Sequence, residues 1–285
     1  MKQLLILSGK GGTGKTTIAS ALIKLAKAKM YADCDVDAPN LHLLMNKNTN
    51  PLCSEYYGMP KAVIDSGLCL RCDVCRQNCR FEAISLKENY LVDTYSCEGC
   101  GVCEALCPVS AISLKPNVAG ELMLYKDESI FSTACLKMGR GNSGKLVSEV
   151  KKQLLLNKVD TDIVIVDGSP GIGCPVIASL SGANMVLIVA EPSLSGINDM
   201  ERIIKTAKQF DSKVAVCINK YDTNIANSNK IEAFCEDSSI PFLGKIPFDN
   251  KAVIAINHNL SVVDVDCAAG RAIKSLFEKA LEILP

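Results

Sequence analysis

Short apolar runs alternate with longer amphipathic stretches over most of the chain. The short runs predict strands at residues 3–7, 30–33, 163–167, 185–190, 214–219 and 242–246. Apolar positions with helical spacing predict helices at residues 15–28, 174–181, 195–210 and 229–235. Because alternating strands and helices build a mainly parallel sheet, we expect an α/β fold whose ligand-binding turns lie at the carboxyl ends of the strands.

This alternation stops between about residues 61 and 117, where cysteine becomes frequent. Four cysteines recur there at a constant offset of 28 (97 − 69), and the segment 83–87 returns at the same offset as 111–115. A stretch this short needs metal or covalent cross-links to fold. We therefore expect a discontinuous domain of residues 1–60 and 118–285, interrupted by a small inserted domain at residues 61–117.

Composition narrows the functional classes. The chain has 285 residues, of which 48% are hydrophobic, and its 31 basic residues balance 31 acidic ones. This balance excludes a strongly basic nucleic-acid binder. The first apolar run is too short for a signal peptide, and no later run approaches the roughly 20 apolar residues of a membrane span. We expect a cytoplasmic protein in which the 15 cysteines stay reduced and the clustered ones hold metal.

A glycine-rich segment lies between the first predicted strand and the first predicted helix. Its pattern is that of a phosphate-binding loop, in which backbone N–H groups surround phosphate oxygens. Lys15 would reach the β and γ phosphates, and the Thr16 hydroxyl would bind Mg²⁺. Asp167 ends an apolar strand, where an Asp usually holds Mg²⁺ through water. The expected nucleotide-binding residues of this segment are Gly9, Gly11, Gly12, Thr13, Gly14, Lys15, Thr16 and Thr17.

The extra Lys10 makes this loop resemble the deviant phosphate loop of the MinD/ParA superfamily of P-loop ATPases. Residues 33–40 (DCDVDAPN) and 163–171 (IVIVDGSPG) resemble the first and second switch segments of that family. The resemblance implies ATP and Mg²⁺ as ligands, ATP hydrolysis and a homodimer that forms with nucleotide. It also implies that Lys10 crosses the dimer interface to the partner's phosphates and that Asp35 positions the attacking water. Lys10, Lys15 and Asp35 are thus the expected catalytic residues.

Other residues near these segments allow two interpretations. Asp33 and Asp37 belong to the first switch, but they could equally form an acidic turn that caps the following helix. Asn219 and Asp249 resemble adenine-side residues of the family. The alternative for both is ordinary turn chemistry at a strand end.

The cysteine-rich region contains the pattern C-x2-C-x2-C-x3-C twice, and the second copy ends in Cys107-Pro108. This resembles the bacterial two-cluster ferredoxins, an α+β fold with two 4Fe-4S clusters in which the fourth cysteine of each copy ligates the other cluster. Structural zinc is the main alternative, but the third closely spaced cysteine would be superfluous at a zinc site. A disulfide framework is disfavoured in a reducing compartment. The resemblance assigns one cluster to Cys69, Cys72, Cys75 and Cys107, and the other to Cys97, Cys100, Cys103 and Cys79.

Arg80 stands where the first copy should have proline. A cationic side chain near a cluster favours the reduced form, so we expect Arg80 to raise a reduction potential. Of the seven remaining cysteines, Cys34 and Cys174 adjoin the two switches and could sense redox state.

The whole chain resembles MinD-superfamily ATPases with an inserted ferredoxin domain. We expect an ATP-hydrolysing protein that couples nucleotide state to electron transfer, with redox donor and acceptor proteins as partners that the sequence does not identify. Two alternatives stay open, a carrier or assembly ATPase for clusters or metals, and a MinD-like spatial organiser with redox-sensing clusters. For the apolar stripe at residues 268–284 we expect a helix packed on the sheet, because its lysines are balanced by glutamates and do not form a basic membrane-binding face.

Overall fold

The computed structural model describes residues 1–45 and 49–285. The chain divides into two compact units, which are treated separately below. The large unit comprises Met1–Cys53, Leu122–Cys135 and Ser143–Pro285. The small unit comprises Ser54–Glu121 and Leu136–Asn142, so the predicted boundaries at residues 61 and 117 lie inside it.

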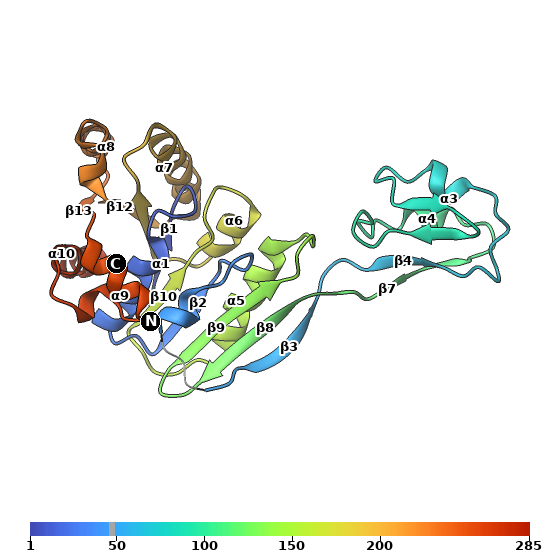
Figure 1. Ribbon diagram of the computed structural model, residues 1–285, viewed down its shortest axis with the longest axis horizontal. Coiled ribbons are helices and arrows are strands. Elements are labelled where there is room, and N and C mark those ends of the chain that lie inside the picture. The colour runs from blue at the N-terminus through green and yellow to red at the C-terminus, as the bar shows by residue number, and fades with distance from the viewer. Residues whose placement is uncertain (46–48) are drawn as a thin grey trace. The chain divides into compact units, whose positions relative to one another are not determined.

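The main sheet has the strand order β13-β12-β11-β1-β10-β2-β9-β8-β3 (Figure 1). The six strands from β13 to β2, and the pairing of β2 with β9, are parallel. This confirms the α/β fold with a mainly parallel sheet. The strands are β1 (Lys2–Leu7), β2 (Met30–Asp33), β3 (Leu52–Tyr57), β8 (Val118–Lys126), β9 (Ile130–Leu136), β10 (Ile163–Asp167), β11 (Met185–Ala190), β12 (Lys213–Asn219) and β13 (Phe242–Ile246).

Helices enclose this sheet because its central strands are apolar on both faces. In β1, Leu4 and Ile6 pack into a core with the first and last helices, while Leu5 and Leu7 are equally buried toward the other face. The helices are α1 (Lys15–Leu25), α2 (Leu41–Leu44), α5 (Ser143–Leu156), α6 (Cys174–Leu180), α7 (Leu194–Ala207), α8 (Ile225–Asp237), α9 (Asn250–Asn257) and α10 (Ala268–Ile283), with short 3-10 turns η1 (Lys208–Phe210), η2 (Tyr221–Thr223) and η3 (Val262–Asp264).

The six predicted strands agree with the structure to within one residue, whereas several other elements have no sequence prediction. Helix α5 has buried residues at Leu146, Val150 and Leu154, which is helical spacing, so its signal was present in the sequence. Strand β8 does not show a regular alternation of buried and exposed positions, so its sequence gives no period-2 signal. Strand β9 is almost wholly buried, and such runs are ambiguous by periodicity alone.

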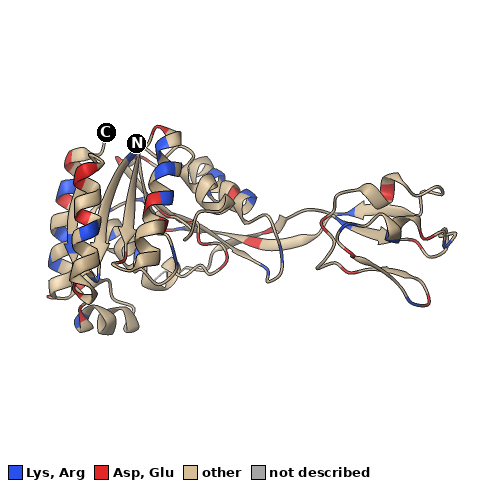
Figure 2. Cartoon of the chain, turned by 90° about the horizontal axis from the view of Figure 1, so that it is seen from above, with Lys and Arg blue, Asp and Glu red and all other residues tan. Residues whose placement is uncertain are grey.

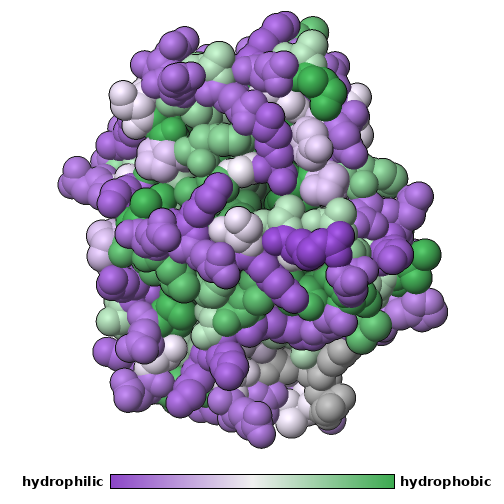
Figure 3. All heavy atoms as spheres, turned by 90° about the vertical axis from the view of Figure 1, so that its left-hand side faces the viewer, coloured by the Kyte–Doolittle hydropathy of each residue, from purple (hydrophilic) through white to green (hydrophobic). Residues whose placement is uncertain are grey.

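Helix α10 carries the C-terminal apolar stripe, and the structure buries it in the large unit. Ile273, Leu276 and Phe277 belong to the same core as α1 and the central strands. Figure 3 shows the face on which α10 lies in Figure 1, where hydrophobic side chains are interspersed with hydrophilic ones. In Figure 2, basic and acidic residues are mixed along the helices of the large unit. The predicted packing of this helix is therefore confirmed. No helix in the described part of the chain combines the length and the hydropathy needed to cross a membrane.

The small unit repeats its backbone as well as its sequence. Its elements are β4 (Lys61–Ile64), α3 (Val74–Gln77), β5 (Ile84–Leu86), β6 (Tyr90–Val92), α4 (Val102–Ala105) and β7 (Ile112–Lys115). The two helices are offset by 28 (102 − 74), as are the starts of β5 and β7 (112 − 84). Strand β4 pairs with β7 and β5 pairs with β6, both antiparallel. Each strand pair thus joins one strand from the first copy of the repeat to one from the second.

Left-handed backbone positions also follow the repeat. Arg71 (φ 56°) corresponds to Gly99 (φ 64°), and Asp73 (φ 66°) corresponds to Gly101 (φ 82°). Because L-residues rarely adopt this conformation, its recurrence at the same places shows that both copies bend around their cysteines in the same way. The core of the unit includes Cys75 and Cys97 among its buried residues.

Candidate functional site

The glycine-rich loop joins the end of β1 to the start of α1, at the carboxyl edge of the parallel strands. Gly12 and Gly14 adopt left-handed conformations (φ 80° and 88°), which let the backbone turn sharply into the helix. A Cβ atom on Gly14 would lie 2.2 Å from Nδ2 of Asn219, so a larger residue would have to displace the Asn219 amide. The loop therefore has the tight conformation expected of a phosphate-binding loop.

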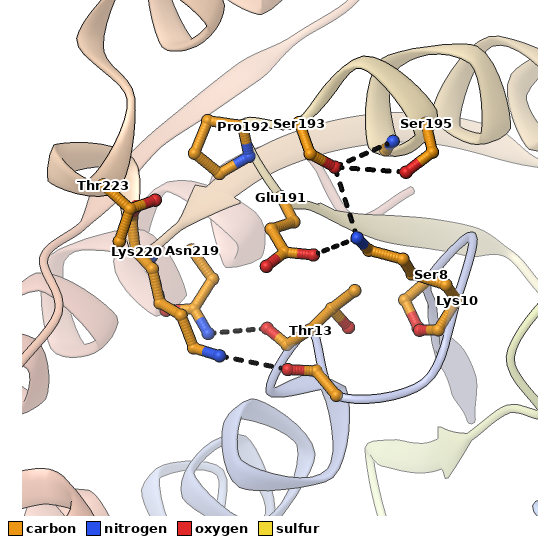
Figure 4. A network of polar contacts seen from close by, with 12 residues as sticks. Ser8, Lys10, Thr13, Glu191, Pro192, Ser193, Ser195, Asn219, Lys220 and Thr223 are labelled. Atoms are coloured by element: carbon orange, nitrogen blue, oxygen red, sulfur yellow. Dashed lines mark hydrogen bonds and ion pairs between the residues drawn. The ribbon is translucent and has the colours of Figure 1, made fainter.

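Two residues at the carboxyl end of β12, its last residue Asn219 and the following Lys220, hold this loop in place (Figure 4). Asn219 Nδ2 donates to the carbonyl oxygen of Thr13 at 2.7 Å, and Lys220 Nζ donates to the carbonyl oxygen of Gly12 at 3.1 Å. The sequence assigned Asn219 to the adenine side of the site by resemblance, and in the structure its amide supports the loop backbone. These contacts fix carbonyl groups of the loop on one side and leave its N–H groups for a ligand.

Lys15 and Asp167 form an ion pair beneath the loop. Lys15 Nζ lies 2.6 Å from Asp167 Oδ1, and the two side chains are 6% and 0% exposed. Burial alone would lower the pKa of Lys15, but the attraction of Asp167 outweighs it and raises that pKa. The second carboxylate oxygen of Asp167 is buried without a hydrogen-bond partner, as is the Thr13 hydroxyl. These orphaned oxygens, with the Thr16 hydroxyl 3.4 Å from Lys15 Nζ, fit a site that a hydrated cation would complete.

Asp33, at the end of β2, serves mainly to fix the segment that follows it. Its carboxylate accepts hydrogen bonds from the backbone N–H groups of Asp35, Asn40 and Leu41, each at 3.0 Å. This matches the helix-capping interpretation, since α2 begins at Leu41. Asp37 takes part in no described capping bond. Burial, reinforced by the nearby Asp167, raises the pKa of Asp33 to about 7.

This raised pKa predicts how stability depends on pH. The pKa of Asp33 is about 7 in the folded protein against 3.8 for the unperturbed side chain, so folding favours the protonated form. Its stabilising contribution is complete below about pH 4 and is lost as the pH rises through 7. We expect urea titrations at pH 5 and pH 8 to show a smaller fall in unfolding free energy for Asp33→Asn than for the wild type. Equal falls in both proteins would exclude Asp33 as the source.

Asp35 faces the cleft above the loop. It lines this cleft together with Asn40 and Pro170, and its side chain is only partly buried. Burial raises its pKa, with Lys15 acting in the opposite direction. Asp35 thus lies between the loop and the second switch, where a water molecule near the terminal phosphate could be polarised.

The other end of the cleft is apolar. Ile246, Phe248, Val253 and Ile256 line it, and Phe248 is 47% exposed. Such a surface suits a planar nucleobase. Asp249 borders this surface, but its carboxylate accepts from the N–H groups of Lys251 and Ala269, which lowers its pKa. It therefore caps α9 and ties α9 to α10.

Lys10 does not point toward the phosphate-binding loop. Figure 4 shows its side chain turned to the segment after β11, where Nζ lies 2.7 Å from Glu191 Oε2 and 3.2 Å from Ser193 Oγ. The hydroxyl of Ser193 also caps α7 by accepting from the N–H of Gly196. Glu191 and Ser193 were not identified from the sequence. Their signal was their place directly after β11, a parallel strand that neighbours β1.

The eight cysteines of the repeat line two separate cavities in the small unit. One is lined by Cys69, Cys72, Cys75 and Cys107, and the other by Cys79, Cys97, Cys100 and Cys103. The chain thus brings together the two sets that the sequence assigned. Across the described residues, no group of three or more His, Cys, Asp or Glu side chains is arranged to hold a metal ion.

The two switch cysteines differ in accessibility. Cys34 is fully buried, and burial raises its pKa to about 12, which disfavours the reactive thiolate. Cys174 is exposed as the first residue of α6. Of the two, Cys174 therefore has the accessibility that redox sensing needs.

A parallel α/β sheet with a glycine-rich loop between β1 and α1, a buried Lys–Asp pair and an apolar base cleft defines a P-loop nucleotide-binding protein. The family model of the CobQ/CobB/MinD/ParA nucleotide binding domain matches residues 4–262. The chain belongs to this family of MinD/ParA-like P-loop proteins.

Similar proteins include both curated relatives and solved structures. The uncharacterized protein MJ0578 of Methanocaldococcus jannaschii is 32% identical over 289 residues, covering 99% of this chain and 97% of that protein. The septum site-determining protein MinD of Synechocystis is 22% identical over 264 residues, covering 89% and 79%. The structure of MinD from Pyrococcus horikoshii complexed with Mg-ADP has a TM-score of 0.60 at 17% identity, covering 98% of this chain and 95% of that one. This likeness shows the shared fold.

Proposed function

We propose that the protein is an ATP-hydrolysing iron–sulfur protein in which nucleotide state is coupled to electron transfer through two 4Fe-4S clusters. The observation that carries the iron–sulfur part is the sorting of eight cysteines into two cavities of four. The observation that carries the nucleotide part is the loop between β1 and α1 with its buried Lys15–Asp167 pair. Both parts belong to a chain of the MinD/ParA family, other members of which are named as ATPases.

Each residue of the nucleotide site has a role that follows from its position. Loop N–H groups and Lys15 bind the phosphates, and Thr16 with Asp167 holds Mg²⁺. Binding breaks the direct Lys15–Asp167 contact, because Lys15 must then face a phosphate and Asp167 must face the hydrated cation. Asp35 orients the attacking water, and Lys10 reaches the phosphates of a second copy in a homodimer. The bound Mg²⁺ supplies charge neutralisation for phosphoryl transfer.

The small unit fits iron–sulfur clusters in three respects. The repeat is present in the sequence, in the element order and in the left-handed positions, as a two-fold binding module requires. Each cavity takes three cysteines from one copy and the fourth from the other, which is the ligation pattern of two-cluster ferredoxins. The N–H of Ala111 donates to Cys107 Sγ at 3.2 Å, a contact that stabilises a thiolate ligand.

The cysteine spacing disfavours zinc, because the third closely spaced cysteine of each copy would be superfluous at a zinc site. In a 4Fe-4S cluster each thiolate binds a different iron, so its cysteines surround a larger volume. When bound, the clusters would supply one-electron redox chemistry.

Within the large unit, a chain of contacts links the second switch to helix α5, which directly follows the small unit in the chain. Helix α6 follows the second switch, and α5 packs beside it. Lys151 of α5 is buried and donates to the carbonyl oxygen of Ser179 at 2.6 Å. Because α5 starts at Ser143, directly after the small unit ends at Asn142, a shift of α6 would reach the small unit through α5.

A combined anaerobic experiment tests this function. We expect purified protein to contain about eight iron atoms per chain, to hydrolyse ATP, and to change at least one cluster potential when ATP is added. Linkage then requires reduction by dithionite to change ATP affinity by the same factor. A Cys107→Ser variant provides the matched control for one cluster. Protein without iron would contradict the proposed function. Cluster potentials that do not change with ATP, together with ATP hydrolysis that does not change on reduction, would contradict the proposed coupling.

The MinD relatives favour a second candidate, a spatial organiser whose clusters sense redox state. A MinC:MinD complex among the similar structures shows that a relative of this kind binds a protein partner. Burial of the α10 stripe removes the membrane-binding surface that the sequence offered for this role. Co-sedimentation with anionic liposomes in the presence of ATP would support the organiser, and its absence would support the electron-transfer function.

A further inference from the structure

The two cysteine cavities have similar backbones but different charged neighbours. Lys61 begins β4, eight residues before Cys69, and the residue at the equivalent place in the second copy is Asn89 (61 + 28). Lys61 belongs to the first copy, but β4 pairs with β7 of the second copy. The lysine therefore lies next to Ala62, which lines the cavity of Cys79, Cys97, Cys100 and Cys103, here called the second cavity.

Lys61 makes a direct contact there. Its Nζ donates a hydrogen bond to the carbonyl oxygen of Cys97, and the lysine is partly buried. A close approach of chain segments allows this reach. Gly99 lies under Pro60, so a Cβ atom on Gly99 would be 2.1 Å from the Pro60 carbonyl oxygen. The first cavity has no such arrangement, because Arg71 occupies the position of Gly99 and its exposed guanidinium donates to Asn89 Oδ1 at 2.9 Å.

Lys61 forms no described ion pair, although Glu98 lines the same cavity. The one ion pair among the described residues of the small unit joins Arg76 to Asp73, which lies beside the first cavity. No described carboxylate pairs with Lys61. A half-buried cation hydrogen-bonded to the backbone of a ligand stabilises the extra electron of a reduced cluster, because solvent screens it less than a fully exposed charge.

We propose that Lys61 raises the reduction potential of the cluster held by Cys79, Cys97, Cys100 and Cys103. This inference rests on the proposed function, since it requires that cluster. Lys61 acts as a positioning and tuning residue for the cluster and is not itself a ligand.

The test is a redox titration of the intact protein under anaerobic conditions, followed by electron paramagnetic resonance. We expect Lys61→Met to shift one of the two midpoint potentials downward, by about tenfold in the reduction equilibrium or about 59 mV for one electron. The other midpoint should move less. Lys61→Gln, which keeps a hydrogen-bond donor without the charge, should show the same fall, whereas Lys61→Arg should stay near the wild type.

Lys87→Met is the matched control, because it removes one exposed lysine from the same unit. A potential that falls equally in Lys87→Met and Lys61→Met would assign the effect to net charge and overturn the inference. Unchanged midpoints in both Lys61→Met and Lys61→Gln would also overturn it. Iron analysis distinguishes a failure of the proposed function from a failure of the role of Lys61. Loss of iron in the wild type contradicts the proposed function, whereas full iron with unmoved potentials contradicts only the role of Lys61.

Discussion

Replacing Lys15 with methionine is expected to abolish ATP binding and to lower the unfolding free energy of the nucleotide-free protein by about 3–5 kcal/mol. The reason is that both members of the pair are buried: the Lys15 side chain is only 6% exposed and that of Asp167 is 0% exposed. The variant would leave the Asp167 carboxylate buried without its partner, next to the buried Asp33. Urea unfolding without nucleotide and equilibrium ATP binding measure the two effects separately.

The double variant Lys15→Met/Asp167→Asn is the control for this interpretation. It removes both charges, and neutral replacements of a buried ion pair cost much less than one stranded charge. We expect it to recover most of the lost stability but none of the ATP binding. If Lys15→Met alone were as stable as the wild type, the buried pair would not contribute to folding stability.

The sequence predicted the central strands well because a parallel sheet covered on both faces produces short, continuous apolar runs. Such runs can be recognised in the sequence without knowledge of the neighbouring strands. Strand β10, with five consecutive buried residues, is an example. Strand β8 lacks this signal, since it mixes exposed and buried positions without a regular period. Its partners in the sheet, β9 and β3, are set by tertiary contacts that no local pattern encodes.

The site shows the same division between local and long-range information. The loop at residues 9–17 could be identified from the sequence because one continuous segment binds the phosphates. For Asp33 the sequence left two interpretations open, a role in the first switch or a helix cap, because its three N–H partners depend on how the next eight residues fold back. Glu191 is separated from Lys10 by 181 residues (191 − 10), and only the order of strands β1 and β11 places them together.

Removal of the Lys10 side chain is also expected to have a large effect on ATP turnover. In the single chain its ammonium is held by Glu191 at 2.7 Å and by Ser193 at 3.2 Å. If Lys10 acts on the phosphates of a second copy, as we propose, it must leave Glu191 when the dimer forms. We expect Lys10→Ala to lower ATP turnover by about 10³-fold, as loss of a charge donated across an interface does. ATP affinity of the single chain should change little, because in the single chain Glu191 and Ser193 already hold the Lys10 ammonium.

Glu191→Gln distinguishes this explanation from a general effect on the loop. It weakens the contact that holds Lys10 while leaving Lys10 itself intact, so ATP should produce dimers at a lower protein concentration. Analytical ultracentrifugation with and without ATP measures this shift, and Lys230→Ala, an exposed lysine on α8, is the matched control for Lys10→Ala. If Glu191→Gln dimerised less readily than the wild type, Glu191 would instead position Lys10 for the partner. If Lys10→Ala hydrolysed ATP normally, hydrolysis would not need a residue from a second chain.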